Sequence, residues 1–367
     1  MSTRPLFALM LTTLISGCAA VDVTQQARFA PQLLDGTAVF GRSIAPAPHQ
    51  DPLSMSLQMR EFVAQDVGSS SFPHVRFRRL MHKLEQQGFF ASPYDQSATF
   101  SAAQTFDRKK GNCVAYTNLF IALAREANLD ASYQKVHVPP KWELSSGLLL
   151  RVNHINVHVG GVRLPGAGSD ELSVDFNSVR PAQDSRKEII SDAHAASMFY
   201  ANLSIEHLGE ADYEQAFAYL KRAALTASDN PDVWTNLGAL YSILGHDAFA
   251  EQAYRVARGI DSKDQAAISG LAKVLRKQGR IEEAEAFAAM VLRYQRVNPY
   301  YHYAVAEQAF NQGAFEQALE AINRAIKLKR RNPQFYAFRA ATAQQLGDQR
   351  LLAKSLRLQH RFTKKES

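Results

Sequence analysis

The sequence predicts an α+β unit followed by an all-α repeat array. Residues 113–128 have the apolar spacing of a helix, and three strand-like runs follow this helix up to residue 177. A helix followed by strands that can pair antiparallel is typical of an α+β unit. From residue 195 onward the strand-like runs stop, and glycines and alanines recur at intervals of 34 residues, which indicates stacked helical hairpins.

Length and composition are those of a globular protein with two or three folded units. The chain has 367 residues, of which 46% are hydrophobic and 21% are charged. Its formal net charge of +7 is a mild excess, and no long basic block occurs. We therefore expect solvated helix faces rather than a nucleic-acid site.

The N-terminus has the features of a secretory signal. One arginine precedes an apolar run from Leu6 to Ile15, which is too short to span a bilayer as a helix. The stretch "LISGC", ending at Cys18, resembles the bacterial lipobox, which implies a signal peptide over 1–17 and acylation of Cys18. Ala19 after this cysteine implies the outer membrane, with the protein on its periplasmic face. Residues 18–71 are expected to be an anchored tether and N-terminal segment, with little periodic structure up to about residue 55.

Cys113 is the second of only two cysteines, so a lipid-modified Cys18 leaves it without an intrachain partner. It lies at the expected start of a helix, where unpaired amides and the macrodipole favour an anion. Arg108, Lys109 and Lys110 add positive potential. The thiolate is the nucleophilic form of cysteine, so this position predicts a reactive group.

A cysteine nucleophile needs a base and a group that orients the base. His154 and His158 lie four residues apart in the run "LLLRVNHINVHVGG", so both point to one face of the expected strand, and geometry alone does not choose between them. Asp175 follows in a further apolar strand, where a neighbouring imidazolium would offset the cost of burying its carboxylate. Cysteine, histidine and aspartate in this order predict a catalytic triad.

These segments resemble the transglutaminase-like branch of the papain-like cysteine enzymes over residues 72–190. "KGNCVAYTNLFIALAREANLDA" resembles the family's cysteine helix, "NHINVHV" its histidine strand and "VDFN" its aspartate strand. The resemblance implies that Cys113 is the nucleophile, His154 the base and Asp175 its orienter, with His158 as the alternative base.

Three further expectations accompany this resemblance. The aromatic residue usual after the family's histidine is Ile155 here. Gln104 is the candidate oxyanion donor beside the Cys113 backbone amide, and Trp142 is the candidate wall of the cleft. No cofactor is expected, and no metal, because no further ligands with known spacing accompany the two histidines.

The C-terminal half resembles the tetratricopeptide repeats. The shared spacing of 34 residues is that family's period, and prolines stand where units begin. The residues that carry the period are Gly245, Gly279, Gly313, Gly347, Ala216, Ala250, Ala284, Ala318, Pro231, Pro299 and Pro333. We expect about five units over 191–362 and a basic tail over 363–367. The resemblance implies a concave face that binds a protein or peptide partner.

Together these observations predict an envelope lipoprotein that attacks peptide or glutamine-type amides through a thioester. Transfer of the acyl group to water would make it a peptidase or amidase, and transfer to an amine would make it a cross-linking transferase. Hydrolysis is the default expectation. The alternative is a non-catalytic outer-membrane scaffold that recruits envelope proteins through its repeats.

Overall fold

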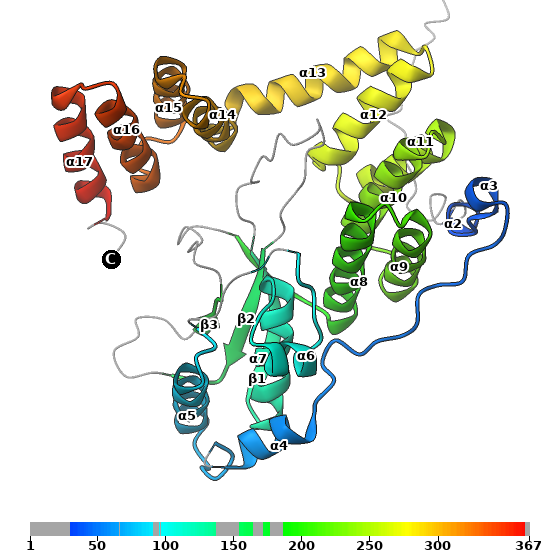
Figure 1. Cartoon of the computed structure of the whole chain (residues 1–367), viewed down its shortest axis with the longest axis vertical. Coiled ribbons are helices and arrows are strands. Elements are labelled where there is room, and N and C mark those ends of the chain that lie inside the picture. Colours follow the sequence, from blue (N-terminus) through cyan, green and yellow to red (C-terminus); the bar gives the residue numbers. More distant parts are fainter. Residues whose placement is uncertain are drawn as a thin grey trace, which may run out of the picture.

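The fold consists of a small antiparallel sheet packed on a buried helix, followed by a long array of helices (Figure 1). The structure is a computed structural model that describes residues 30–65, 67–90, 95, 97–136, 154–163, 172–176 and 186–363. The helices before the sheet are α2 (Ala30–Leu33), α3 (Thr37–Phe40), α4 (Leu57–Ala64), α5 (Pro73–Gln86), α6 (Ala102–Arg108) and α7 (Cys113–Glu126).

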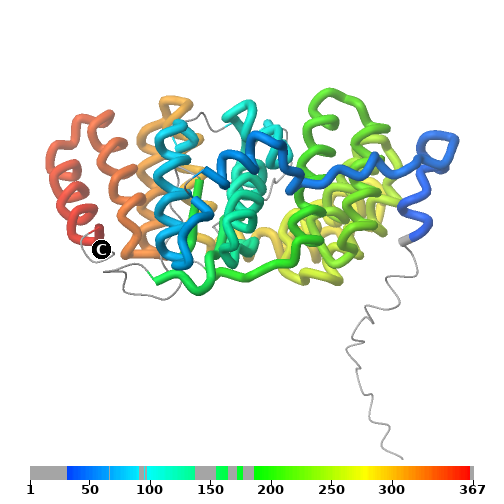
Figure 2. Tube along the Cα trace, turned by 90° about the horizontal axis from the view of Figure 1, so that it is seen from below, coloured from blue at the N-terminus to red at the C-terminus, as the bar shows by residue number. Residues whose placement is uncertain are grey.

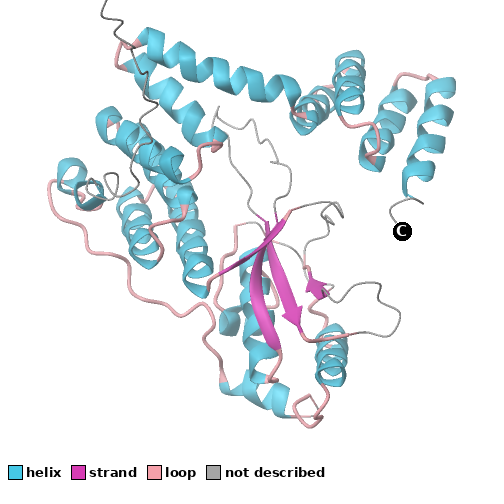
Figure 3. Cartoon of the chain, turned by 180° about the vertical axis from the view of Figure 1, so that it is seen from behind, coloured by secondary structure: helices cyan, strands magenta, loops and turns pink. Residues whose placement is uncertain are grey.

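Within the described residues the sheet has four antiparallel strands in the order β3-β2-β1-β4. They are β1 (Asp130–Val136), β2 (His154–Gly160), β3 (Leu172–Val174) and β4 (Lys187–Ile190). Helix α7 is buried from Cys113 to Ala124 and lies along the sheet (Figure 3). The edge strand β4 was not predicted, because its residues "KEII" are mostly exposed and show no alternation. It exists through its pairing with β1.

The α+β unit is followed by ten helices that form five antiparallel hairpins. They are α8 (Asp192–Gly209), α9 (Tyr213–Thr226), α10 (Pro231–Ile243), α11 (Asp247–Ile260), α12 (Gln265–Lys277), α13 (Ile281–Val297), α14 (Pro299–Asn311), α15 (Phe315–Leu328), α16 (Pro333–Gln345) and α17 (Gln349–Thr363). The four glycines at intervals of 34 residues have φ between 71° and 80° and lie in the turns of the second to fifth hairpins, where an L side chain would be strained. The first hairpin has Ala211 at the equivalent position, with φ 59°. This array confirms the predicted fold class.

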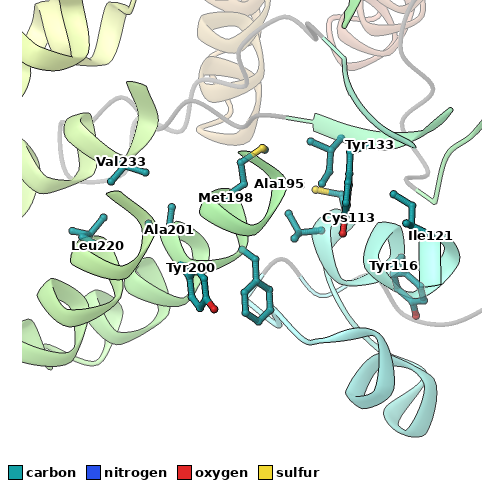
Figure 4. Packing of buried hydrophobic residues seen from close by; sticks show 14 of the residues in the cluster. Cys113, Tyr116, Ile121, Tyr133, Ala195, Met198, Tyr200, Ala201, Leu220 and Val233 are labelled. Carbon is teal, nitrogen blue, oxygen red and sulfur yellow. The ribbon is translucent and has the colours of Figure 1, made fainter. Parts of the chain in front are cut away.

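The hydrophobic core divides the array unequally. One continuous cluster of buried side chains runs from the sheet and α7 through α8–α12 to Ala284 at the start of α13. Figure 4 shows part of it, with Cys113 and Tyr133 on one side and Met198 and Ala195 of α8 on the other. The helices from α14 to α17 contain a second cluster of their own, which includes Ile322 and Phe335. The first hairpins and the α+β unit therefore form one body.

The N-terminal segment differs from the expected tether. Residues 33–50 run along the outside of helices α8–α11, and we call them the strap (Figure 2). Leu33, Ile44 and Ala47 of the strap are almost completely buried. Side chains of the array hold strap carbonyls, as in the 2.6 Å hydrogen bonds that Lys221 donates to Ile44 and Tyr241 donates to Leu33. Apart from the end of α2 and the short helix α3, the strap has no regular secondary structure, and tertiary contacts fix its position.

Within the described residues, no helix has the length and apolar character needed to cross a membrane. The expected signal peptide, Cys18 and the basic tail after residue 363 lie outside the described residues. Trp142 also lies outside them.

Candidate active site

Cys113 is the first residue of helix α7 and is 8% exposed. The preceding Asn112 caps the helix, since its side-chain Oδ1 accepts a hydrogen bond of 3.0 Å from the Ala115 amide. Any residue other than glycine at position 111 would clash with the helix, because its Cβ atom would lie 2.6 Å from the Cβ of Ala115. The tight approach before the helix therefore fixes where the thiol is placed.

The first turns of α7 lie against the start of β2. Thr117, one turn after the cysteine, donates a hydrogen bond of 3.4 Å to the carbonyl oxygen of Ile155. This contact places Cys113 beside His154, close enough for the thiol to affect the pKa of the imidazole. His154, the first residue of β2, therefore lies beside Cys113, the first residue of α7.

The imidazole of His154 is held on its other side by Asp175. Its Nε2 lies 2.6 Å from Asp175 Oδ2, so Nδ1 is the ring nitrogen left for Cys113. Asn156, two residues along β2, donates a hydrogen bond of 3.3 Å to the same carboxylate oxygen. Asp175 lies one residue beyond β3 rather than inside it. The structure therefore brings Cys113, His154 and Asp175 into one row, in which His154 and Asp175 are hydrogen-bonded.

The residue after the aspartate, Phe176, anchors it to helix α7. Phe176 stacks on Tyr116 of α7 with ring centroids 5.6 Å apart, and on Phe90 at the same distance. The stacking of Phe176 holds the end of β3 against α7. The contact keeps β3 beside α7 and so sets the position of Asp175.

The charge state of the site follows from these contacts. Burial disfavours the charged imidazole, but hydrogen bonds to Asp175 and Cys113 outweigh burial and raise the pKa of His154 to about 9. His154 is therefore an imidazolium at neutral pH, which is the state that stabilises a neighbouring thiolate.

This raised pKa predicts a pH-dependent stability. An unperturbed histidine has a pKa of about 6.5, so His154 stabilises the fold fully below that pH and loses its contribution as pH rises through about 9. We expect the free energy of unfolding to fall by up to about 3 kcal/mol over this range. Urea denaturation at a series of pH values measures the fall. It should shrink in Asp175→Asn, and an unchanged fall in that variant would contradict the assignment.

The alternative base, His158, lies four residues further along β2, opposite Ser132 and Ser173. Four residues of a strand span about 13 Å, so it is far from the row that contains Cys113. Its Nδ1 atom is buried and has no hydrogen-bond partner among the residues that the structure describes. Of the two histidines, only His154 is brought to the thiol.

Gln104 and the basic residues have other partners. The side-chain oxygen of Gln104 accepts a hydrogen bond of 3.0 Å from the Ser101 amide and so caps α6. Lys110 pairs with Asp95 at 2.9 Å. Arg108 and Lys109 lie over the rings of two phenylalanines, Phe100 and Phe89. In the described contacts, none of the three cations reaches Cys113, so the charged neighbour of the thiol is His154.

Sequence reasoning placed Asn112 just before the helix without giving it a role in the site, and it missed the roles of Asn156 and Phe176. The pattern "GNC" before an apolar helix contains the signal for the first, because asparagine is a favoured N-cap. The other two act through tertiary contacts that no local pattern shows. Among the described residues there is no group of three or more histidine, cysteine, aspartate or glutamate side chains that could hold a metal ion.

Comparisons with known families agree with this organisation. The model of the transglutaminase-like superfamily matches residues 62–162, which include Cys113 and His154 but end before Asp175. A tetratricopeptide-repeat model matches residues 248–308. The chain therefore contains a transglutaminase-like domain and a tetratricopeptide-repeat array.

Solved structures similar to the chain are repeat proteins. One is MamA, residues 41 to the end, from Desulfovibrio magneticus RS-1, with 17% identity over 46% of this chain and 96% of that chain and a TM-score of 0.27. Another is YrrB, described as a tetratricopeptide-repeat protein with an unusual peptide-binding site, with 13% identity over 45% of this chain and 86% of that chain and a TM-score of 0.27. No curated protein matches the chain.

Proposed function

We propose that the chain is a cysteine enzyme that cleaves or transfers peptide or glutamine-type amides through a thioester. The observation that carries this proposal is the row of Cys113, His154 and Asp175 at the start of a buried helix, in which Asp175 is hydrogen-bonded to His154. A core cysteine would need neither a charged imidazole nor a carboxylate beside it. Nucleophile, base and orienting group at these positions match the requirements of acyl transfer.

The reaction begins with attack of the Cys113 thiolate on the amide carbonyl carbon. In the described contacts the Cys113 amide donates no hydrogen bond, so this N–H at the helix start is available to the developing oxyanion. His154 then gives its Nδ1 proton to the leaving nitrogen, the C–N bond breaks and a thioester remains. His154 next takes a proton from water or an amine, which attacks the thioester carbonyl; the C–S bond breaks and the Cys113 thiolate is released beside the imidazolium. Water as acceptor, and hence hydrolysis, is our first choice.

The repeat array would select the protein that is attacked. A groove on helices α8, α10 and α12 is lined by apolar side chains that include Ile205, Leu208 and Ile243, with Asn236 and Lys273 beside them. Apolar walls with a few polar groups suit an extended segment of a partner protein.

We further propose that Cys18 is acylated and anchors the protein to the outer membrane on its periplasmic side. Residues 19–29 then link the lipid to the strap, and eleven residues span at most about 40 Å. The helices that bind the strap would therefore lie near the membrane surface. A Cys18→Ser protein that still partitions with membranes would argue against this anchor.

Envelope proteomics tests the enzyme against the scaffold alternative. Cells that produce Cys113→Ala should lose specific cleaved or cross-linked proteins that are present with the unmodified chain. Cys113→Ala removes only the Sγ atom at a site that is 8% exposed, so we expect the repeats and their partners to be retained. Identical product profiles, with partners still captured by the repeats, would favour the scaffold.

A further inference from the structure

The first helix of the repeat array contacts the segment that precedes the catalytic helix. Glu206 lies on α8, and its Oε1 accepts a hydrogen bond of 2.8 Å from the backbone amide of Thr99. Thr99 belongs to the α+β unit and is 3% exposed. These two residues are 107 positions apart in the sequence, so the contact joins the two parts of the chain.

The contact continues from Thr99 to the start of α7. Asn112 donates a hydrogen bond of 2.8 Å from Nδ2 to Thr99 Oγ1, and its backbone amide donates one of 2.9 Å to Ala98. Through Oδ1, Asn112 also caps the helix that begins at Cys113. Glu206, Thr99 and Asn112 therefore form one hydrogen-bonded path that ends at the residue before the nucleophile.

The surroundings of Glu206 suit a fixed acceptor. The side chain is half-buried, and burial raises the pKa of its carboxyl although the hydrogen bond from Thr99 opposes the rise. Partial burial of the Glu206 carboxylate costs free energy. Its hydrogen bond to the Thr99 amide offsets this cost, because that amide would otherwise be a buried donor without a partner.

Helix α8 has the groove of the array on its other side. Ser204, Ile205 and Leu208 line that groove. Because an α-helix has 3.6 residues per turn, Glu206 lies on the opposite side of α8 from these three residues. One helix therefore separates the groove from the loop that carries Thr99.

We infer that Glu206 is a positioning residue of the active site, through which the repeat array sets the geometry of the helix start that carries Cys113. This inference rests on the proposed function. It makes the array part of the catalytic unit and not only a device for recruiting substrate. If Glu206 no longer accepts from Thr99, the loop shifts, the cap at Asn112 loosens, and the thiol loses its alignment with His154.

A pair of substitutions of similar shape tests this inference without a known substrate. Glu206→Gln keeps an acceptor oxygen, and Glu206→Met keeps the length but has no acceptor. Both are made in the full chain carrying Cys18→Ser, in which Cys113 is the only cysteine. The rate of alkylation of Cys113 by iodoacetamide is measured from pH 5 to pH 10, with circular dichroism to monitor folding. Glu210→Met, exposed just after α8, is the matched control.

We expect Glu206→Met to lower the alkylation rate at pH 7 about tenfold and to shift its pH profile upward, with Glu206→Gln and Glu210→Met within about twofold of the parent. Rescue by glutamine attributes the effect to the acceptor oxygen. The inference is overturned if the methionine variant reacts like the parent, if it unfolds, or if glutamine is as slow as methionine. A parent chain whose Cys113 reacts no faster than free cysteine would instead contradict the proposed function itself.

Discussion

Replacing His154 with alanine is expected to slow product formation about a thousandfold, whereas His158→Ala should leave it within about threefold. The difference follows from where the two histidines lie relative to Cys113. His154 lies beside Cys113 and is hydrogen-bonded to Asp175 through Nε2, so its Nδ1 is the nitrogen available for proton transfer to the leaving group. His158 lies four residues along the same strand, about 13 Å away, and cannot reach the thiol without a rearrangement of the sheet.

The readout is the set of envelope products that Cys113→Ala abolishes. These products should also be lost in His154→Ala and kept in His158→Ala, at equal amounts of each protein in the envelope. A second measurement is alkylation of Cys113 at pH 6, which should slow in His154→Ala because the imidazolium that stabilises the thiolate is gone. If the products are lost in His158→Ala but kept in His154→Ala, the base is His158 and our assignment of His154 is wrong.

The sequence was sufficient to predict the types of residue in the site, because their chemistry is local. The helix start at Cys113 follows from a cap residue and an apolar stripe. It was not sufficient to choose between His154 and His158, which share a face of β2. That choice depends on which end of the strand the helix touches, and this is set by the contact of Thr117 with the Ile155 carbonyl.

The residues that support the site were hidden for the same reason. Asn156 and Phe176 act on Asp175 through contacts across the sheet and with α7. Glu206 acts from another part of the chain, through a backbone amide that any residue at position 99 except proline would present. Contacts to backbone groups leave no trace in the sequence of the segment that is held.

The strap is a longer segment that is held through its backbone and whose own sequence therefore does not show that it is fixed. Lys221, Arg222 and Tyr241 hold it by its carbonyl oxygens, and the Ala47 amide donates a hydrogen bond of 2.9 Å to Ala218. Its residues "APAPHQ", from Ala45 to Gln50, have the composition of a linker, although these contacts fix the segment. The sequence predicted the period of the array correctly but not what covers its outer side.

Replacing Ile44 with aspartate is therefore expected to destabilise the body formed by the α+β unit and the first hairpins by at least about 3 kcal/mol. Ile44 is 3% exposed, so the new carboxylate would be buried and the apolar contacts of the side chain would be lost. Its neighbour Ala45 is exposed, and Ala45→Asp adds the same charge with an expected change within about 0.5 kcal/mol.

Urea denaturation of the two variants measures this difference, and limited proteolysis reports whether the strap is released. In Ile44→Asp we expect cleavage within residues 33–50 at a protease concentration that leaves Ala45→Asp intact. Equal stability of the two variants would mean that the strap is not part of the folded body. Because the strap connects the N-terminus to helices α8–α11, its release would also free those helices from the membrane-proximal position that an acylated Cys18 would give them.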